Sequence, residues 1–178
     1  MKTTVLKSFL ALLLIGFTSC SGTKSMNGDK MFADMDTESY DILTLAATNP
    51  ELSIVTDLIQ KANLDTQLML KNQPVTLFLP TNEAFKEMSY NDLKNLTSNK
   101  SELMSILKRH ILPNKVMTYD LNESQIIETS GEEEITISTT NSNFINIGGA
   151  QVIKSDVMAK NGVIHIVNRL IEPTRDVL

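Results

Sequence analysis

Apolar residues in the first half of the chain recur at the three- to four-residue spacing of helices. This spacing predicts helices over Tyr40–Ala47 and Pro50–Ala62, with Asn49 placed to cap the second one. A third helix is predicted over Lys100–Arg109, and its first turn resembles a capping box. The residues that define this third helix are Asn99 and Glu102 at its start and Leu103, Ile106, Leu107 and His110 along its apolar face.

A short apolar run between these helices indicates a strand instead. Val75–Leu79 contains no charged residue, and Pro80 is expected to end the strand. Asn82 follows at a position where its side chain can cap a brief helix, predicted over Glu83–Met88. Phe85 then falls on the buried side of that helix.

The last third of the chain has the alternating, β-branched pattern of strands. Its clearest signal is a hairpin, in which Gln151–Ala159 and Val163–Ile171 are joined through Lys160, Asn161 and Gly162. Asn-Gly favours the positive φ values of a tight hairpin turn. The other predicted strand segments are Lys115–Thr118, Gln125–Thr129, Glu133–Thr139 and Asn143–Gly148.

The second strand of this hairpin carries apolar side chains on both faces, which predicts an interior position in the sheet. His165 lies within this strand and is interpreted as a neutral, hydrogen-bonded core histidine. His110, at the end of an apolar helical face, receives the same interpretation. One face of the strand carries Ile164, Ile166 and Leu170, and the other Val163, His165 and Val167.

Composition narrows the range of functions. The 178 residues are 42% hydrophobic and 21% charged, as in an ordinary globular protein. The net charge of −5 argues against nucleic-acid binding, which needs a clustered basic face. Cys20 is the only cysteine, so an internal disulfide framework and a cysteine zinc cluster are both excluded. We expect no metal and no other cofactor.

Residues 1–19 have the basic start and short apolar run of a secretory signal, and the run Phe9–Phe17 is too short to cross a bilayer. Cys20 follows a pair of small residues, which resembles the bacterial lipobox. The resemblance implies cleavage before Cys20, acylation of its thiol and anchoring in membrane lipid. Since Ser21 is not the Asp of inner-membrane retention, an outer-membrane destination is favoured, on either its periplasmic or its surface side. The alternative is an ordinary secretory signal with an incidental Cys20.

Residues 20–37 are rich in small and polar side chains and predict a flexible, lipidated tether. The alternative is a ragged N-terminus of the domain itself. The domain is predicted over residues 38–174.

Three segments of this domain resemble the signature boxes of fasciclin domains. They are Thr76–Phe85 (TLFLPTNEAF), Leu107–Val116 (LKRHILPNKV) and Asn161–Pro173 (NGVIHIVNRLIEP), in the order of that family. The resemblance implies a single α+β domain, built as a β-sheet wedge flanked by helices, with a binding or adhesive role. The residues that match the family motifs, all interpreted as structural, are Thr81, Asn82, Phe85, His110, Asn161, Gly162 and His165.

An enzyme is the alternative, since His110, His165 and Asp156 could form a metal site, or a base with its orienting carboxylate. No carboxylate lies near either histidine in the sequence, and the nucleophile elbow, the P-loop and the dinucleotide turn are absent. We therefore expect no catalysis. The acidic run Glu132–Glu134 is interpreted as a solvated turn, since it lacks the spacing of a calcium loop.

Two classes of function remain in competition. The leading hypothesis is a lipid-anchored adhesion or recognition module of the bacterial envelope, whose partner is an extracellular or envelope protein or a glycan. The alternative is a carrier of a small hydrophobic ligand, which needs an apolar cavity between sheet and helices. A structural spacer in the envelope is a third interpretation.

Overall fold

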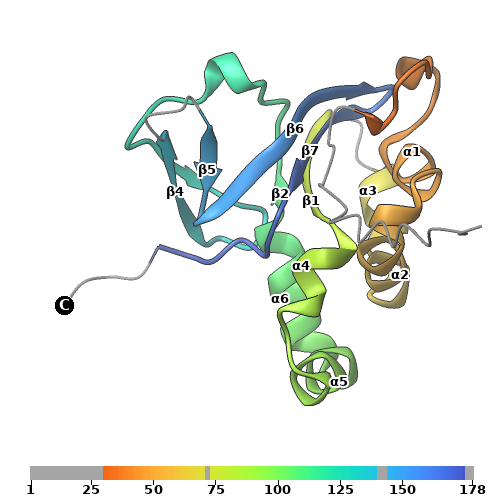
Figure 1. Cartoon of the computed structure of the whole chain (residues 1–178), viewed down its shortest axis with the longest axis vertical. Helices are drawn as coiled ribbons and strands as arrows, with labels where there is room; N and C mark the ends of the chain where they lie inside the picture. The colour runs from red at the N-terminus through yellow and green to blue at the C-terminus, as the bar shows by residue number, and fades with distance from the viewer. Residues whose placement is uncertain (1–29, 71–72, 140–143, 175–178) are drawn as a thin grey trace, which may run out of the picture.

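The strands of the domain form one mixed sheet of seven, in the order β2-β1-β7-β6-β5-β4-β3 (Figure 1). The computed structural model describes residues 30–70, 73–139 and 144–174. Strands β1 and β7 run parallel, and the other neighbours are antiparallel. The strands are β1 (Val75–Pro80), β2 (Ile111–Leu112), β3 (Ile126–Glu128), β4 (Glu134–Thr139), β5 (Ile145–Ile147), β6 (Ala150–Ala159) and β7 (Gly162–Val167).

Helices cover one side of β1 and β7 and extend beyond one end of the sheet (Figure 1). Over the described part of the chain, no helix has the length and apolar character needed to span a membrane. The α-helices are α1 (Ile42–Ala47), α2 (Ser53–Lys61), α3 (Leu64–Leu70), α4 (Asn82–Lys86), α5 (Tyr90–Ser98) and α6 (Lys100–Arg109), and the 3-10 turns are η2 (Thr37–Ser39), η3 (Pro50–Leu52) and η4 (Thr118–Asp120).

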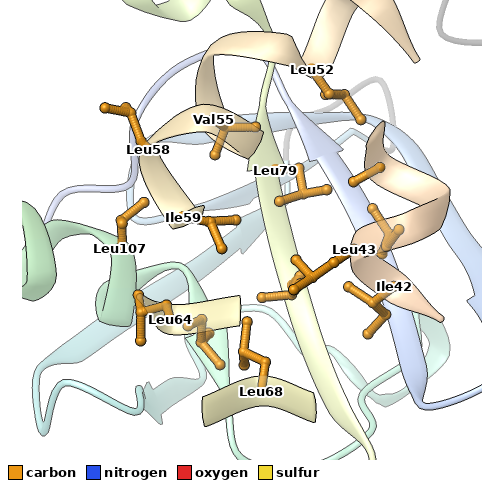
Figure 2. Close-up of a cluster of buried hydrophobic side chains, with 14 of the residues drawn as sticks. Ile42, Leu43, Leu52, Val55, Leu58, Ile59, Leu64, Leu68, Leu79 and Leu107 are labelled. Carbon is orange, nitrogen blue, oxygen red and sulfur yellow. The ribbon is translucent and has the colours of Figure 1, made fainter. Parts of the chain in front are cut away.

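The first core cluster fills the space between the sheet and the helices. Figure 2 shows side chains of α1, η3, α2 and α3 converging on β1, where Leu79 is 1% exposed. From the sheet, Ile164 and Ile166 of β7 join this cluster. Met31, Phe32 and Met35, which belong to the predicted tether, are partly buried against it. These three side chains attach the described end of the tether segment to the domain.

A second cluster lies on the opposite face of the same strands. Alternate residues of a strand point to opposite faces of the sheet. Phe78 of β1 and Val167 of β7 therefore point away from the first cluster and pack with residues of β4 and β5. Because β7 contributes to both clusters and lies between β1 and β6, the predicted interior position of this strand is confirmed. The other fully buried members of the second cluster include Leu112, Ile135, Ile137, Ile147 and Ile171.

The strand predicted over Lys115–Thr118 is wrong. This segment is held by a side chain instead: the Thr76 hydroxyl accepts from the Val116 amide and donates to the Asn114 carbonyl, both at 2.8 Å. Thr118 then begins η4. The Thr76 hydroxyl thus uses backbone groups that pairing with a neighbouring strand would need. This contact comes from a distant strand, so the alternating pattern of the segment could not predict it.

Candidate functional site

The three fasciclin-like boxes meet at the centre of the sheet. The first box begins in β1 and the third contains β7, and these strands pair in parallel from Val75↔Gly162 to Pro80↔Val167. The intermediate box supplies β2, which lies on the other side of β1. Segments about 90 residues apart in sequence are thus direct neighbours, which makes the boxes one structural unit.

His165 is bound through both ring nitrogens inside this unit. Its side chain is completely buried, Nε2 lies 2.9 Å from the Val116 carbonyl, and Nδ1 accepts from the Asp156 amide at 3.2 Å. One donor and one acceptor is the pattern of a neutral imidazole. Burial lowers the pKa of His165, which favours the same neutral form. The ring also stacks on Phe78, the residue opposite it in β1, with centroids 5.3 Å apart.

His110 has an equivalent arrangement at another position. It ends α6, where Nδ1 lies 2.8 Å from the Ile106 carbonyl and Nε2 accepts from the Ile171 amide at 2.9 Å. Burial lowers its pKa to about 4. His110 therefore connects the end of α6 to the segment that follows β7.

His110, His165 and the Asp156 carboxylate do not come together as a catalytic or metal site. Asp156 meets His165 through its backbone amide, whereas its carboxylate accepts from the amide of Thr118 at 2.8 Å and binds the hydroxyl of the same residue. His110 is bonded to different segments altogether. Asp156 has a φ of 57° and lies in an irregular stretch of β6, so its carboxylate fixes η4 against a distorted strand.

The predicted role of Asn82 as the cap of its own helix is wrong. Thr81 occupies the N-cap position of α4, and Asn82 is the first helical residue. The Asn82 side chain reaches another helix instead: Oδ1 accepts from the Ile54 amide at 3.0 Å, and Nδ2 donates to the Pro50 carbonyl at 2.9 Å. It therefore links the β1–α4 turn to the start of α2.

The neighbours of Asn82 in this motif are buried. Phe85 is 3% exposed in the first core cluster, on the predicted buried side of α4. Thr81 is completely buried, and its amide donates to the Val167 carbonyl at 3.1 Å. Strand β1 thus ends level with the end of β7, and the chain turns from there into α4.

The predicted hairpin between β6 and β7 is present, but its glycine serves a different purpose. Ala159 pairs with Gly162, so the loop consists of Lys160 and Asn161, and neither has a positive φ. A Cβ at Gly162 would lie 1.9 Å from the Val75 carbonyl oxygen. Gly162 is therefore required for the close approach of β7 to β1.

Asn161 extends this contact to the first helix. Its Oδ1 accepts from the amide of Ile42 at 2.8 Å, and its carbonyl accepts from the Val75 amide at 3.2 Å. The hairpin loop thereby fixes the start of α1 and the start of β1 together.

The acidic run contains an ion pair that the sequence analysis missed. Glu133 binds the guanidinium of Arg109, and the Ser105 hydroxyl donates to the same carboxylate at 3.3 Å. The Arg109 guanidinium holds the pKa of Glu133 below its usual range. Only Glu132 and Glu134 are exposed, so the prediction of a wholly solvated turn is wrong. The partners are 24 residues apart, and no local pattern marks them.

Cys20, the predicted lipidation residue, lies outside the described residues. Within the described ranges, no group of three or more His, Cys, Asp and Glu side chains could hold a metal ion.

Comparison with known proteins identifies the same family as the three fasciclin-like boxes. The fasciclin domain family matches residues 50–173. Protein sll1483 of Synechocystis is 31% identical over 134 residues, which cover 74% of this chain and 73% of that protein. The Transforming growth factor-beta-induced protein ig-h3 of Sus scrofa is 29% identical over 121 residues, 68% of this chain and 17% of its own length. Human periostin is 30% identical over 118 residues, which cover 65% of this chain and 14% of periostin.

A solved structure shares the fold. The FAS1 domain pair from the insect cell adhesion molecule Fasciclin I matches with a TM-score of 0.55 and 21% identity, over 70% of this chain and 46% of that chain. The chain thus corresponds to a small part of the two animal proteins and to about half of the domain pair. The family match and the union of the three boxes in one sheet lead to one conclusion: this chain belongs to the fasciclin domain family.

Proposed function

We propose that this chain is a non-catalytic recognition module of the bacterial envelope, anchored in membrane lipid through Cys20 and binding an extracellular or envelope partner. The observation that carries the proposal is the use of both imidazoles inside the fold. Each of the four ring nitrogens is bonded to a main-chain group, so the two histidines serve to position strands and helices, which supports a role without catalysis.

The fasciclin relatives support a role in binding. The solved domain pair comes from a protein described as a cell adhesion molecule, and its fold is the fold of this chain. A scaffold whose central strands and motif side chains are buried leaves its exposed helices, turns and loops to contact a partner. We therefore expect the partner to meet the periphery of the domain and not its central motif.

The packing favours recognition over transport of a hydrophobic ligand. A carrier needs an apolar cavity between sheet and helices. In this region side chains of α1, α2 and α3 pack against β1 (Figure 2). Four leucines of this cluster, Leu45, Leu52, Leu77 and Leu79, are at most 1% exposed. Native mass spectrometry of the protein purified from its own host checks this choice. We expect the mass of the acylated chain alone, whereas an additional small molecule retained in stoichiometric amount would favour the carrier.

Binding itself is tested with the full-length protein, purified in detergent, against a panel of matrix proteins, glycans and envelope extracts. We expect saturable binding to at least one component. The matched control is the same protein after heat denaturation, which should not bind. Failure across the whole panel would contradict the recognition role.

A further inference from the structure

A polar groove runs between α6 and the turn that connects β3 to β4. It has a volume of about 630 Å³. One wall is a stripe along α6, and the other wall is the turn at residues 130–132. The lining includes Lys100, Met104 and Lys108 from the helix, and Ser130 and Glu132 from the turn.

Both walls are held in place by bonds outside the groove. The Ser130 amide donates to the Ile111 carbonyl at 2.8 Å, which ties the turn to β2. Glu133, next to the turn, is bound by Arg109 at the end of α6. A ligand would therefore find a groove that is already formed, and its binding would not require ordering of the walls.

Several polar groups of the groove have no partner inside the protein. Among the residues that the structure describes, the ammonium groups of Lys100 and Lys108 form no ion pair, and neither does the carboxylate of Glu132. Ser130 Oγ is the one buried side-chain oxygen or nitrogen of the described ranges without a hydrogen-bond partner. Buried polar atoms are nearly always paired, and Ser130 belongs to the groove lining, so a ligand in the groove could supply the missing bond after a rotation of this side chain.

The arrangement of these groups indicates an elongated ligand. Lys100 and Lys108 are eight residues apart on one stripe of α6, which places their backbones about 12 Å apart along the helix axis. Met104 lies halfway between them and offers an apolar surface. The groove thus has two cations at its ends, a thioether between them, and hydroxyl and carboxylate groups along its sides. These groups are complementary to a short oligosaccharide that carries acidic groups. Its carboxylates would bind the lysines, its hydroxyls would bond to Ser130 and Glu132, and its C–H face would cover Met104.

We propose that this groove binds an acidic glycan that contains uronic acid residues. The inference rests on the proposed recognition function and names the class of its partner. The volume lies in the range of small-ligand sites, which run to roughly 1,000 Å³, and the walls combine polar and apolar surface in similar shares, as the two faces of a sugar do. A protein partner would instead favour an apolar patch with large aromatic anchors, which this lining does not contain. The lining holds two ammonium groups against the single carboxylate of Glu132, in a chain with a net charge of −5, so acidic groups of a ligand would bind at the two lysines.

Calorimetric titration of the full-length protein in detergent tests the site. The probe is oligogalacturonate, and a neutral cello-oligosaccharide of the same length serves as the control probe. We expect saturable binding of the acidic probe, weaker binding at higher salt, and no binding of the neutral one. The double variant Lys100→Glu/Lys108→Glu should lower the affinity by at least about tenfold.

The matched control is Lys61→Glu/Lys160→Glu, which makes the same change in net charge at two exposed lysines on α2 and on the β6–β7 loop. It should change the affinity by less than about twofold, because long-range charge effects are screened at physiological salt. Ser130→Ala should weaken binding without lowering the melting temperature, since the removed hydroxyl has no partner in the folded protein. A purely structural role of Ser130 would instead appear as a lower melting temperature with unchanged affinity.

Three results would overturn the inference: no binding of oligogalacturonate, equal binding of the neutral probe, or an equal loss of affinity in the two double variants. Each of them leaves the recognition role standing if the protein still binds another component of the panel saturably. Failure against the whole panel would remove both the site and the proposed function.

Discussion

Both histidines use their two ring nitrogens to join segments that are distant in the sequence. His165 connects β7 to the segment before η4 and to the distorted part of β6, and His110 connects α6 to the segment after β7. An imidazole suits this role because its neutral form provides one donor and one acceptor on opposite sides of a flat ring. At the scale of single residues, the two histidines of the family motif therefore act as connectors.

This role predicts a loss of stability in mild acid. The pKa of His110 falls from its ordinary value near 6.5 to about 4 in the folded state, so the unfolded state binds more protons between these values. The stabilising effect is complete above pH 6.5, decreases as the pH falls towards 4, and amounts to on the order of 3 kcal/mol. The lowered pKa of His165 acts in the same direction.

Urea unfolding at a series of pH values measures this effect. The variant His110→Gln keeps an amide donor and an acceptor but does not titrate. It should show a smaller loss of unfolding free energy than the parent over this range. Identical pH profiles for the two proteins would contradict the buried, neutral state of His110.

Gly162 is a second residue whose identity is required by its surroundings. Gly162→Ala would place a methyl group 1.9 Å from the Val75 carbonyl oxygen, which forces β7 away from β1. We expect a loss of at least about 2 kcal/mol in the free energy of unfolding, measured by urea denaturation. Gly131→Ala is the control, because its new Cβ would meet only ordinary contacts of 3.4 Å or more. Equal effects of the two substitutions would show that the close approach at Gly162 has no energetic importance.

At the scale of elements, the sequence predicted those helices and strands that a local apolar pattern or a capping residue determines. The helix over Lys100–Arg109, the strand from Val75 and the β6–β7 hairpin are confirmed. Helices α3 and α5 were missed. The α3 helix begins directly after Asn63, which has a φ of 57°, and α5 buries only Leu96, so neither has a long apolar stripe of its own.

The site was predictable to a smaller extent. The burial of His165 followed from the apolar residues beside it, but its partners Val116 and Asp156 did not, because they come from other segments. The groove beside α6 was missed for the same reason. Its lysines and its turn are separated in sequence and come together only when β2 and β3 are in place.

Asn82 gives a prediction at this scale, because it joins two elements. Asn82→Ala removes the acceptor of the Ile54 amide and the donor to the Pro50 carbonyl. We expect a loss of about 1 to 2 kcal/mol in thermal or urea unfolding, the amount typical of a lost cap. Asn82→Asp keeps the acceptor and should recover part of this loss. If Asn82→Ala unfolds like the parent, the link between β1–α4 and α2 contributes nothing to stability.

At the scale of the whole molecule, the proposed anchor decides where the domain acts. Cys20→Ser should abolish metabolic labelling with palmitate and move the protein from the detergent phase to the aqueous phase, because no other residue would carry the acyl chains. The control is Ser21→Ala, which leaves the thiol in place and should retain the label. Unchanged labelling of Cys20→Ser would remove the lipid anchor from the proposed function.

The most direct test of envelope recognition measures attachment of living cells. A deletion strain of the native host is complemented with the parent gene, with Cys20→Ser or with Lys100→Glu/Lys108→Glu, and attachment to surfaces coated with matrix proteins or acidic glycans is counted. We predict that deletion lowers attachment, that the parent gene restores it, and that Cys20→Ser does not. The groove variant should fail to restore attachment to acidic glycans. Attachment of the deletion strain at the level of the parent strain on every surface would contradict the account.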